Sequence, residues 1–209
     1  RIRYTTSHPN DMTEGLIAAH GEVDKLMPFL HLPVQAGSDR ILAAMNRSHS
    51  SESYLRVIER VRAVRPDIAL SGDFIVGFPG ETEAEFEDTL RIVDEVRYAA
   101  CFSFKYSPRP GTPAATMEGQ IAPDVMADRL QRLQARLAHH QYAFNQASVG
   151  KTCTVMIDRT GRDPGQWLGK SPWLQSVWFE GDYAIGDLVE VTLADAGPNS
   201  LRGVVSAPA

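Results

Sequence analysis

The first 106 residues alternate between apolar, strand-like runs and helical segments, and this alternation restricts the fold more than any other feature of the chain. Strands separated by helices pair in parallel through right-handed crossovers. The runs are nearly continuously apolar, as expected for strands that helices cover on both faces. A closed barrel of this kind needs eight such units in about 250 residues. We therefore predict an α/β fold with an open sheet or incomplete barrel, built on four strands: Ile2–Thr6, Phe29–Val34, Ile68–Phe78 and Ala100–Tyr106.

Capping residues and apolar spacing predict the helices between these strands. Asp11 and Glu14 have the spacing of a capping box at the start of the first helix, over residues 11–21. Ser38 is expected to cap a short helix over residues 38–46, and Thr82 and Glu85 predict a box for the last helix. A longer helix is predicted over residues 51–64. Its inner face is expected to carry Val57, Val61 and Val64.

A proline-rich connection, residues 107–123, leads to a long helix predicted over Pro123–Gln146. Its apolar stripe is expected to comprise Met126, Leu130, Leu133 and Leu137. A neighbouring basic stripe contains Arg129, Arg132 and Arg136. Like charges on one helix face more often indicate a solvated surface than an RNA contact. The sequence leaves both interpretations of the basic stripe open.

After Gly150 the helical periodicity gives way to the alternation of short strands. Strand-like runs cover residues 151–158, 176–179 and 188–193, with glycines and short turns between them. This pattern predicts a small barrel of about five strands. We therefore expect two domains: a partial core with its linker helix at residues 1–146, and an all-β domain at residues 147–209.

Composition restricts partners and compartment. The net charge of −5 over 209 residues gives no broad basic footprint, so an RNA contact must come from local patches. Cys101 and Cys153 lie far apart in apolar runs and are expected to be free thiols in a reducing compartment. We expect neither a membrane span nor a signal peptide. These features predict a cytoplasmic protein, without a membrane partner and monomeric.

Polar residues and glycines gather at the predicted carboxyl ends of the strands, where parallel sheets bind ligands. Gly77 and Gly80 follow the third strand. A glycine there lets a ligand approach the backbone, although a tight turn into a helix explains it equally well. Asp73 is harder to explain, because an unpaired carboxylate in a buried strand is unfavourable. A ligand with hydroxyl groups would partner both Asp73 and Gln35.

Three long motifs carry a resemblance to a known family. LHLPVQAGSDRILAAMNR (Leu30–Arg47), DFIVGFPGET (Asp73–Thr82) and YSPRPGTPA (Tyr106–Ala114) are similar to the radical SAM core of the tRNA methylthiotransferases, in the same order. RIRYTTSHP at the start is similar too. Residues 146–209, with GPNSLRG near the end, resemble the TRAM domain that follows that core. The resemblance covers nearly the whole chain, and several ordered motifs are more specific than one short pattern.

The resemblance implies roles for individual residues. Gln35 and Asp73 correspond to residues that hydrogen-bond the ribose of S-adenosylmethionine. Arg47 matches the arginine that holds the methionine carboxylate, a group that suits an arginine fork. Without the resemblance, a cation at a helix carboxyl terminus would be the preferred interpretation of Arg47. The strand whose backbone meets the adenine is matched by Ile75, Val76 and Gly77.

The resemblance also implies two 4Fe-4S clusters, one held by a CxxxCxxC run near the first core strand and one by three upstream cysteines. Such clusters need thiolate ligands. The two cysteines of this chain have neither spacing. RIRYTTSHP matches the third core strand of the family, so we expect the cluster ligands to precede Arg1. We therefore interpret the chain as the carboxyl-terminal part of the enzyme, unable to perform the radical step by itself.

The implied reaction places a methylthio group on C2 of N6-dimethylallyladenosine beside the anticodon of tRNA. S-adenosylmethionine supplies the radical and the methyl group. The TRAM-like part would bind tRNA, with Lys170, Trp173 and Arg202 as candidate contacts beside the basic stripe. Trp173, in a polar turn, is expected to be exposed and to stack on unpaired bases. Trp178 alternates with apolar neighbours and is expected in the core.

Other functions stay open at this point. Within the family, the substrate is alternatively threonylcarbamoyl-adenosine tRNA or a ribosomal protein, although LPVQAGSDRILAAMNR and FSFKYSPRPGTPA look more like the dimethylallyladenosine branch. From another class, the chain is alternatively a non-catalytic RNA-binding fragment. A sugar-phosphate barrel enzyme would need a catalytic lysine or acid pair at the rim, and the sequence offers no such pair.

Overall fold

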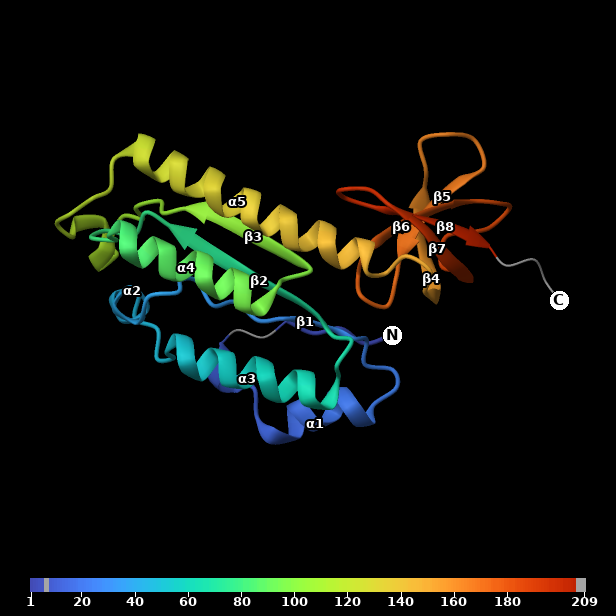
Figure 1. Cartoon of the computed structure of the whole chain (residues 1–209), viewed down its shortest axis with the longest axis horizontal. Helices are drawn as coiled ribbons and strands as arrows, with labels where there is room; N and C mark the ends of the chain where they lie inside the picture. The colour runs from blue at the N-terminus through green and yellow to red at the C-terminus, as the bar shows by residue number, and fades with distance from the viewer. Residues whose placement is uncertain (6–7, 206–209) are drawn as a thin grey trace.

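The computed structural model describes residues 1–5 and 8–205, and it consists of two parts joined by a long helix (Figure 1). The first part has a parallel sheet in the order β1-β2-β3, formed by Phe29–His31, Ala69–Val76 and Ala100–Lys105. The second part is a closed five-stranded barrel in the order β4-β5-β6-β8-β7. The predicted class, an incomplete α/β barrel followed by a small all-β barrel, is confirmed.

The helices of the first part supply the apolar core beneath the sheet. They are α1 (Glu14–Glu22), α2 (Asp39–Ala44), α3 (Ser51–Val64), α4 (Glu83–Val96) and α5 (Pro123–Gln146), with short 3-10 helices at Pro9–Asp11 and Pro113–Thr116. Leu30 and Phe74 from the sheet pack with Tyr54 of α3, Phe86 of α4 and Leu133 of α5 in one buried cluster. Val64, which we expected on the inner face of α3, is 40% exposed.

Two predictions at the amino-terminal end were wrong. Ile2 and Thr5 form isolated parallel bridges, to Leu26 and His31, and no regular strand forms in the described part of Ile2–Thr6. Thr6 and Ser7 lie outside the described residues. The first helix is capped by Thr13 rather than Asp11, because a 3-10 turn that begins at Pro9 already includes Asp11.

The two faces of the sheet differ in their cover. Side chains alternate along a strand, and Phe74 of β2 points toward the helices and is buried. On the other face, Asp73 and Ile75 are partly exposed. Their β3 partners Phe102 and Phe104 are 60% and 53% exposed. We expected helices on both faces, but in the part of the chain described here this second face is left partly exposed around these four residues. The face with Asp73, Ile75, Phe102 and Phe104 is called the open face below.

The start of α4 follows the predicted capping box. Thr82 Oγ1 accepts a bond from the Glu85 amide at 3.3 Å, and Glu85 Oε2 accepts from the Thr82 amide at 2.8 Å. Arg40 Nε donates to Glu85 Oε1 at 2.6 Å. These bonds, with Arg40 contributing most, lower the pKa of Glu85 to about 2. The cap therefore ties α4 to α2 through an ionised carboxylate.

We expect the free energy of unfolding of Glu85→Gln to decrease less than that of the wild type as pH falls. Because the pKa of Glu85 is lower in the folded protein, its bonds contribute stability above about pH 4.5, and this contribution is lost as pH falls toward 2. With the exposure of Arg40 taken into account, the contribution is about 2 kcal/mol. Urea unfolding between pH 5 and pH 2 measures it. Glu95→Gln, an exposed position on the same helix, should keep the wild-type dependence of the unfolding free energy on pH. The same dependence in Glu85→Gln would contradict the assignment.

The barrel confirms the expected number of strands. They are β4 (Thr152–Thr160), β5 (Gln166–Lys170), β6 (Ser176–Glu180), β7 (Leu188–Ala196) and β8 (Leu201–Val205). Only β4, β6 and β7 had been located from the sequence. Alternating residues of these strands, among them Val155, Val177, Phe179 and Leu193, fill the centre of the barrel.

Contacts of Arg1, Arg3 and Trp173, beside those of α5, hold the barrel against the first part. Arg1 Nη1 donates to the carbonyl of Lys170 at 3.0 Å, and Arg3 donates to the carbonyl of Ser171 at 2.8 Å. Trp173 packs against the cluster that contains Phe29, and its indole nitrogen lies 3.3 Å from an oxygen of Asp67. Figure 1 shows α5 running from the sheet to the barrel. The two parts are thus joined through space as well as along the chain.

Candidate cofactor rim and RNA interface

Asp73 lies on the open face near the carboxyl end of β2, and its side chain is 28% exposed. His31 of β1 lies close to it, with Nε2 3.6 Å from Asp73 Oδ2. The other ring nitrogen of His31 is bonded to Ser71 Oγ at 3.0 Å. The carboxylate therefore avoids the apolar layer under the helices and faces the side on which a ligand would bind. Sequence reasoning did not identify His31.

The backbone places Gln35 beside Asp73. The Gln35 amide donates to the Asp73 carbonyl at 2.9 Å, and the Ile75 amide donates to the Gln35 carbonyl at 2.9 Å. Gln35 is buried and has a φ of +78°, which a residue with a side chain rarely adopts. Such strain is often retained at functional sites. The strained bridge extends the β1–β2 pairing to the edge at the carboxyl ends of these strands, which is called the rim below.

Arg47 lies just beyond α2, the helix that follows the rim loop. Its amide donates to the Leu42 carbonyl at 2.9 Å, and the preceding Asn46 has a φ of +58°. Its side chain is partly exposed. The structure brings Gln35 and Asp73 together through their backbones, whereas the convergence of Arg47 on the same cleft stays a prediction.

Gly77 turns the chain out of β2 with a φ of +75°. A Cβ atom there would lie 2.3 Å from Cγ of Met126, a residue of α5. Packing against α5 therefore requires the glycine. Of the two interpretations considered from the sequence, room for a ligand and a tight turn, the first does not hold on the side where a Cβ would point, because Met126 fills that space. Val76 precedes it as a buried residue of the helix-covered face.

A buried ion pair lies directly under this turn. Glu81 Oε2 accepts a bond from the Gly77 amide at 2.8 Å and one from Arg129 Nη1 at 2.8 Å. The Glu81 and Arg129 side chains are only 1% and 6% exposed. Burial raises the pKa of Glu81, while the Gly77 amide and Arg129 act in the opposite direction. Sequence reasoning missed Glu81, although an acid just after a glycine turn was a usable signal.

The basic stripe of α5 faces α4 and is paired with acids, so the RNA contact considered for it stays a prediction. Arg129 pairs with Glu81 and also reaches Glu83. Arg132 binds Glu83 and Glu87 and stacks on Phe86, 4.7 Å from the ring centroid. Arg136 pairs with Asp94. The three guanidinium groups are engaged by acids of α4 and of the turn before it, so they stabilise a helix–helix interface.

Lys170 and Trp173 do not form the exposed loop that we expected. Lys170 is partly buried at the end of β5, its ammonium group donates to Ser176 Oγ at 2.8 Å, and burial lowers its pKa. Trp173 is half-buried between the barrel and the sheet. The turn folds back because the Leu174 amide bonds to the Ser171 carbonyl at 3.1 Å. Both side chains therefore lie at or near the domain junction.

Trp178 lies on the outside of the barrel, contrary to our expectation of a core position. Its neighbours Val177 and Phe179 are buried, so alternation directs Trp178 outward, where it is partly exposed. Arg202 of β8 pairs with it across the sheet, and its guanidinium group lies 5.8 Å from the indole centroid. A neighbouring hollow is lined by Trp178, Leu168, Gln166, Arg162, Asp163 and Ser200. This outer surface joins an aromatic ring to cationic side chains.

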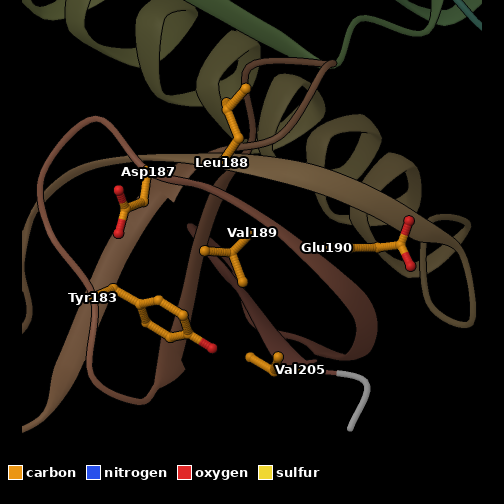
Figure 2. A pocket seen from close by; sticks show the side chains of 6 residues that line it. All are labelled: Tyr183, Asp187, Leu188, Val189, Glu190 and Val205. Atoms are coloured by element: carbon orange, nitrogen blue, oxygen red, sulfur yellow. The ribbon is translucent and has the colours of Figure 1, made fainter. Parts of the chain in front are cut away.

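A second hollow of the barrel is acidic. In Figure 2, Val189 points between Tyr183 and Val205, while the carboxylates of Asp187 and Glu190 extend to opposite sides. Leu188 completes the lining. Two carboxylates repel phosphate, so we place no RNA contact at this hollow.

The two cysteines are free and lie in different parts of the molecule. Cys101 is on β3 and Cys153 is on β4. Burial raises the pKa of both thiols, that of Cys153 to about 11. Among the residues that the structure describes, no group of three or more His, Cys, Asp or Glu side chains is arranged to hold a metal ion. The thiols present do not fit an iron–sulfur cluster, which needs several thiolates together.

None of the described helices has the length and apolar character needed to cross a membrane.

Comparisons with known proteins agree with this architecture. Residues 1–93 match the model of the radical SAM superfamily, and residues 146–206 match the TRAM domain. A protein of Erythrobacter litoralis is 75% identical over 203 residues, 97% of this chain and 46% of its own length. Proteins of Novosphingobium aromaticivorans and Zymomonas mobilis are 73% and 67% identical, with the same coverage. All three are named tRNA-2-methylthio-N(6)-dimethylallyladenosine synthase.

The parallel sheet, its rim and these matches define a segment of a radical SAM core joined to a TRAM barrel. Over 97% of its length the chain is similar to proteins named tRNA-2-methylthio-N(6)-dimethylallyladenosine synthase. It spans about half the length of the curated relatives it matches. The match of residues 1–93 favours a radical SAM core over the sugar-phosphate barrel enzyme considered from the sequence.

Proposed function

We propose that the chain supplies the S-adenosylmethionine rim and an RNA-binding surface of an enzyme that adds a methylthio group to C2 of N6-dimethylallyladenosine in tRNA, beside the anticodon. The observation that carries this proposal is the 75% identity over 203 residues to a relative of that name. The same names favour this substrate over threonylcarbamoyl-adenosine tRNA or a ribosomal protein. We infer a cytoplasmic and monomeric enzyme; the free thiols of Cys101 and Cys153 support the reducing compartment.

At the rim, Asp73 would accept hydrogen bonds from the ribose hydroxyls of S-adenosylmethionine, and Gln35 would complete that contact. Arg47 would hold the methionine carboxylate as a cationic fork. The backbone of Ile75–Gly77 would meet the adenine. The position of Asp73 on the open face and the strained bridge at Gln35 support this fit. When bound, the cofactor supplies the one-electron chemistry that an unreactive C–H bond requires.

We assign no step to iron–sulfur clusters within this chain, because Cys101 and Cys153 do not fit as ligands. The complete enzyme would hold two 4Fe-4S clusters with cysteines outside this sequence. The contribution of this chain is to bind and orient. The rim holds the nucleoside cofactor, and the barrel holds RNA.

A chimeric protein tests the proposal as a whole. The chain would replace the matching segment of the Erythrobacter litoralis relative, and the chimera would be expressed in cells that lack this tRNA modification. We expect mass spectrometry of tRNA nucleosides to detect the 2-methylthio product. A folded chimera that binds RNA but leaves tRNA unmodified would favour the alternative of a non-catalytic RNA-binding fragment.

For RNA binding, Trp178→Ala is expected to weaken the affinity of the chimera for an anticodon stem-loop about tenfold, because a stacked base contributes about 1–3 kcal/mol. Arg202→Ala should also weaken binding and reduce its salt dependence. Fluorescence anisotropy at low salt measures both effects. Arg159→Ala, another exposed barrel arginine, is the matched control. Wild-type affinity in Trp178→Ala and Arg202→Ala would exclude this surface.

A further inference from the structure

We propose that Glu81 and Arg129 are positioning residues for the adenine end of the cofactor rim, and that helix α5 therefore sets the geometry of the β2 turn. The proposal rests on the proposed function, in which the backbone of Ile75–Gly77 meets adenine. It adds that this stretch of backbone is held by a buried ion pair reaching over from α5 as well as by its neighbours in the sheet.

A continuous set of bonds leads from α5 to the backbone of the turn. Arg129 Nη1 donates to Glu81 Oε2 at 2.8 Å and to the Glu81 carbonyl at 3.1 Å. The same Oε2 accepts the Gly77 amide at 2.8 Å. Arg129 thus fixes the carboxylate, and the carboxylate fixes the orientation of the peptide between Val76 and Gly77. Charge-assisted bonds of this kind are short and strongly directional.

Packing holds the same turn from two sides. Met126 lies where a Cβ of Gly77 would be, so α5 is pressed against the turn. On the other side, the Gly80 amide donates to the Gly119 carbonyl at 2.8 Å, and Arg40 donates to the Gly80 carbonyl at 2.6 Å. The turn from Gly77 to Glu81 is therefore enclosed between α5, the connection that precedes α5, and α2, which leaves its backbone little freedom.

A structural role alone would not require charges at this place. An apolar pair of similar volume is often as stable as a buried ion pair, because removing two charges from water is unfavourable. An apolar pair would leave the Gly77 amide without an acceptor. The arrangement of Glu81 between that amide and Arg129 therefore points to control of the turn geometry, beyond stability.

Paired variants of the 209-residue chain separate geometry from stability. Glu81→Met with Arg129→Met removes both charges and the acceptor for the Gly77 amide. Glu81→Gln with Arg129→Met removes both charges but keeps an acceptor. The matched control on the same helix pair is Asp94→Asn with Arg136→Met. Calorimetry would measure the binding of S-adenosylmethionine and of 5′-methylthioadenosine, which has the adenosine part without the methionine, for variants that keep the wild-type circular dichroism.

We expect the Met–Met pair to weaken binding of both ligands about tenfold, the Gln–Met pair to recover most of the affinity, and the control pair to bind as wild type does. Arg47→Met should weaken only S-adenosylmethionine. Equal affinity in the Met–Met and wild-type proteins would overturn the positioning role. If the wild-type chain binds neither ligand, the proposed function fails, and hydrogen exchange then decides the inference. Faster exchange of the Gly77 amide in the Met–Met pair than in the Gln–Met pair supports the positioning role of Glu81 and Arg129, and equal exchange rejects it.

Discussion

Asp73→Ala should reduce the affinity of the chain for S-adenosylmethionine and for 5′-methylthioadenosine by about 100-fold. The carboxylate lies on the open face at the end of β2, and both ribose hydroxyls of either ligand would donate to it. A hydrogen bond to a charged group contributes about 1.5–3 kcal/mol, so the loss of two explains a change of this size. Asp73→Asn keeps the shape but not the charge, and we expect an intermediate affinity. Isothermal titration calorimetry measures all three proteins.

The control for Asp73 is Glu52→Gln, an acid on α3 whose side chain is 80% exposed and which pairs with Arg56 one helical turn on. It should bind both ligands as wild type does. Circular dichroism checks that each variant is folded. If Asp73→Ala keeps wild-type affinity while folded, the cofactor does not bind at this rim.

Arg129→Met should lower the free energy of unfolding by about 3–5 kcal/mol, the usual effect of removing one partner of a buried ion pair. The variant leaves the Glu81 carboxylate, 1% exposed, without its positive partner. Arg136→Met, on the same helix but paired with a half-exposed Asp94, should lower it by less than about 1 kcal/mol. Urea unfolding of the three proteins at pH 7.5 measures the difference.

Acid should relieve the defect in Arg129→Met. Burial already raises the pKa of Glu81, and loss of Arg129 removes a contact that opposes this rise. The folded variant then binds a proton more readily than the unfolded chain, so its deficit relative to wild type shrinks as pH falls toward the pKa of free glutamate. A deficit that is the same at pH 5 and pH 8 would show that the charge of Glu81 is not its cause.

Local rules of chain geometry predicted much of the fold. The cap at Thr82, the bounds of α5 and the five-stranded barrel depend on capping, helical spacing and strand alternation, all of which act over a few residues. Alternation also predicts an outward position for Trp178, because Val177 and Phe179 on either side of it are buried. We had placed Trp178 in the core because its neighbours are apolar, without asking to which face of the strand its own side chain points.

Contacts between distant segments could not be predicted in the same way. Trp173 is covered by residues more than 100 positions away, including Asp67. The arginines of α5 find their partners on α4, and no rule of sequence spacing states which helix lies beside which. For the rim, the resemblance correctly pointed to Gln35 and Asp73 as neighbours, but the ion pair beneath them depends on the packing of α5.

The length and attachments of α5 have a consequence for the register of RNA on the enzyme. Its 24 residues span about 36 Å, and Arg1, Arg3 and Trp173 prevent the barrel from turning freely at its end. Under the proposed function, the helix sets the distance between the nucleotide that the barrel holds and the adenosine at the rim. One residue inserted into it would swing the barrel by about 100°, whereas seven would nearly restore its heading about 10 Å further along. The length of α5, together with the contacts to the bases, would then determine which adenosine reaches the rim.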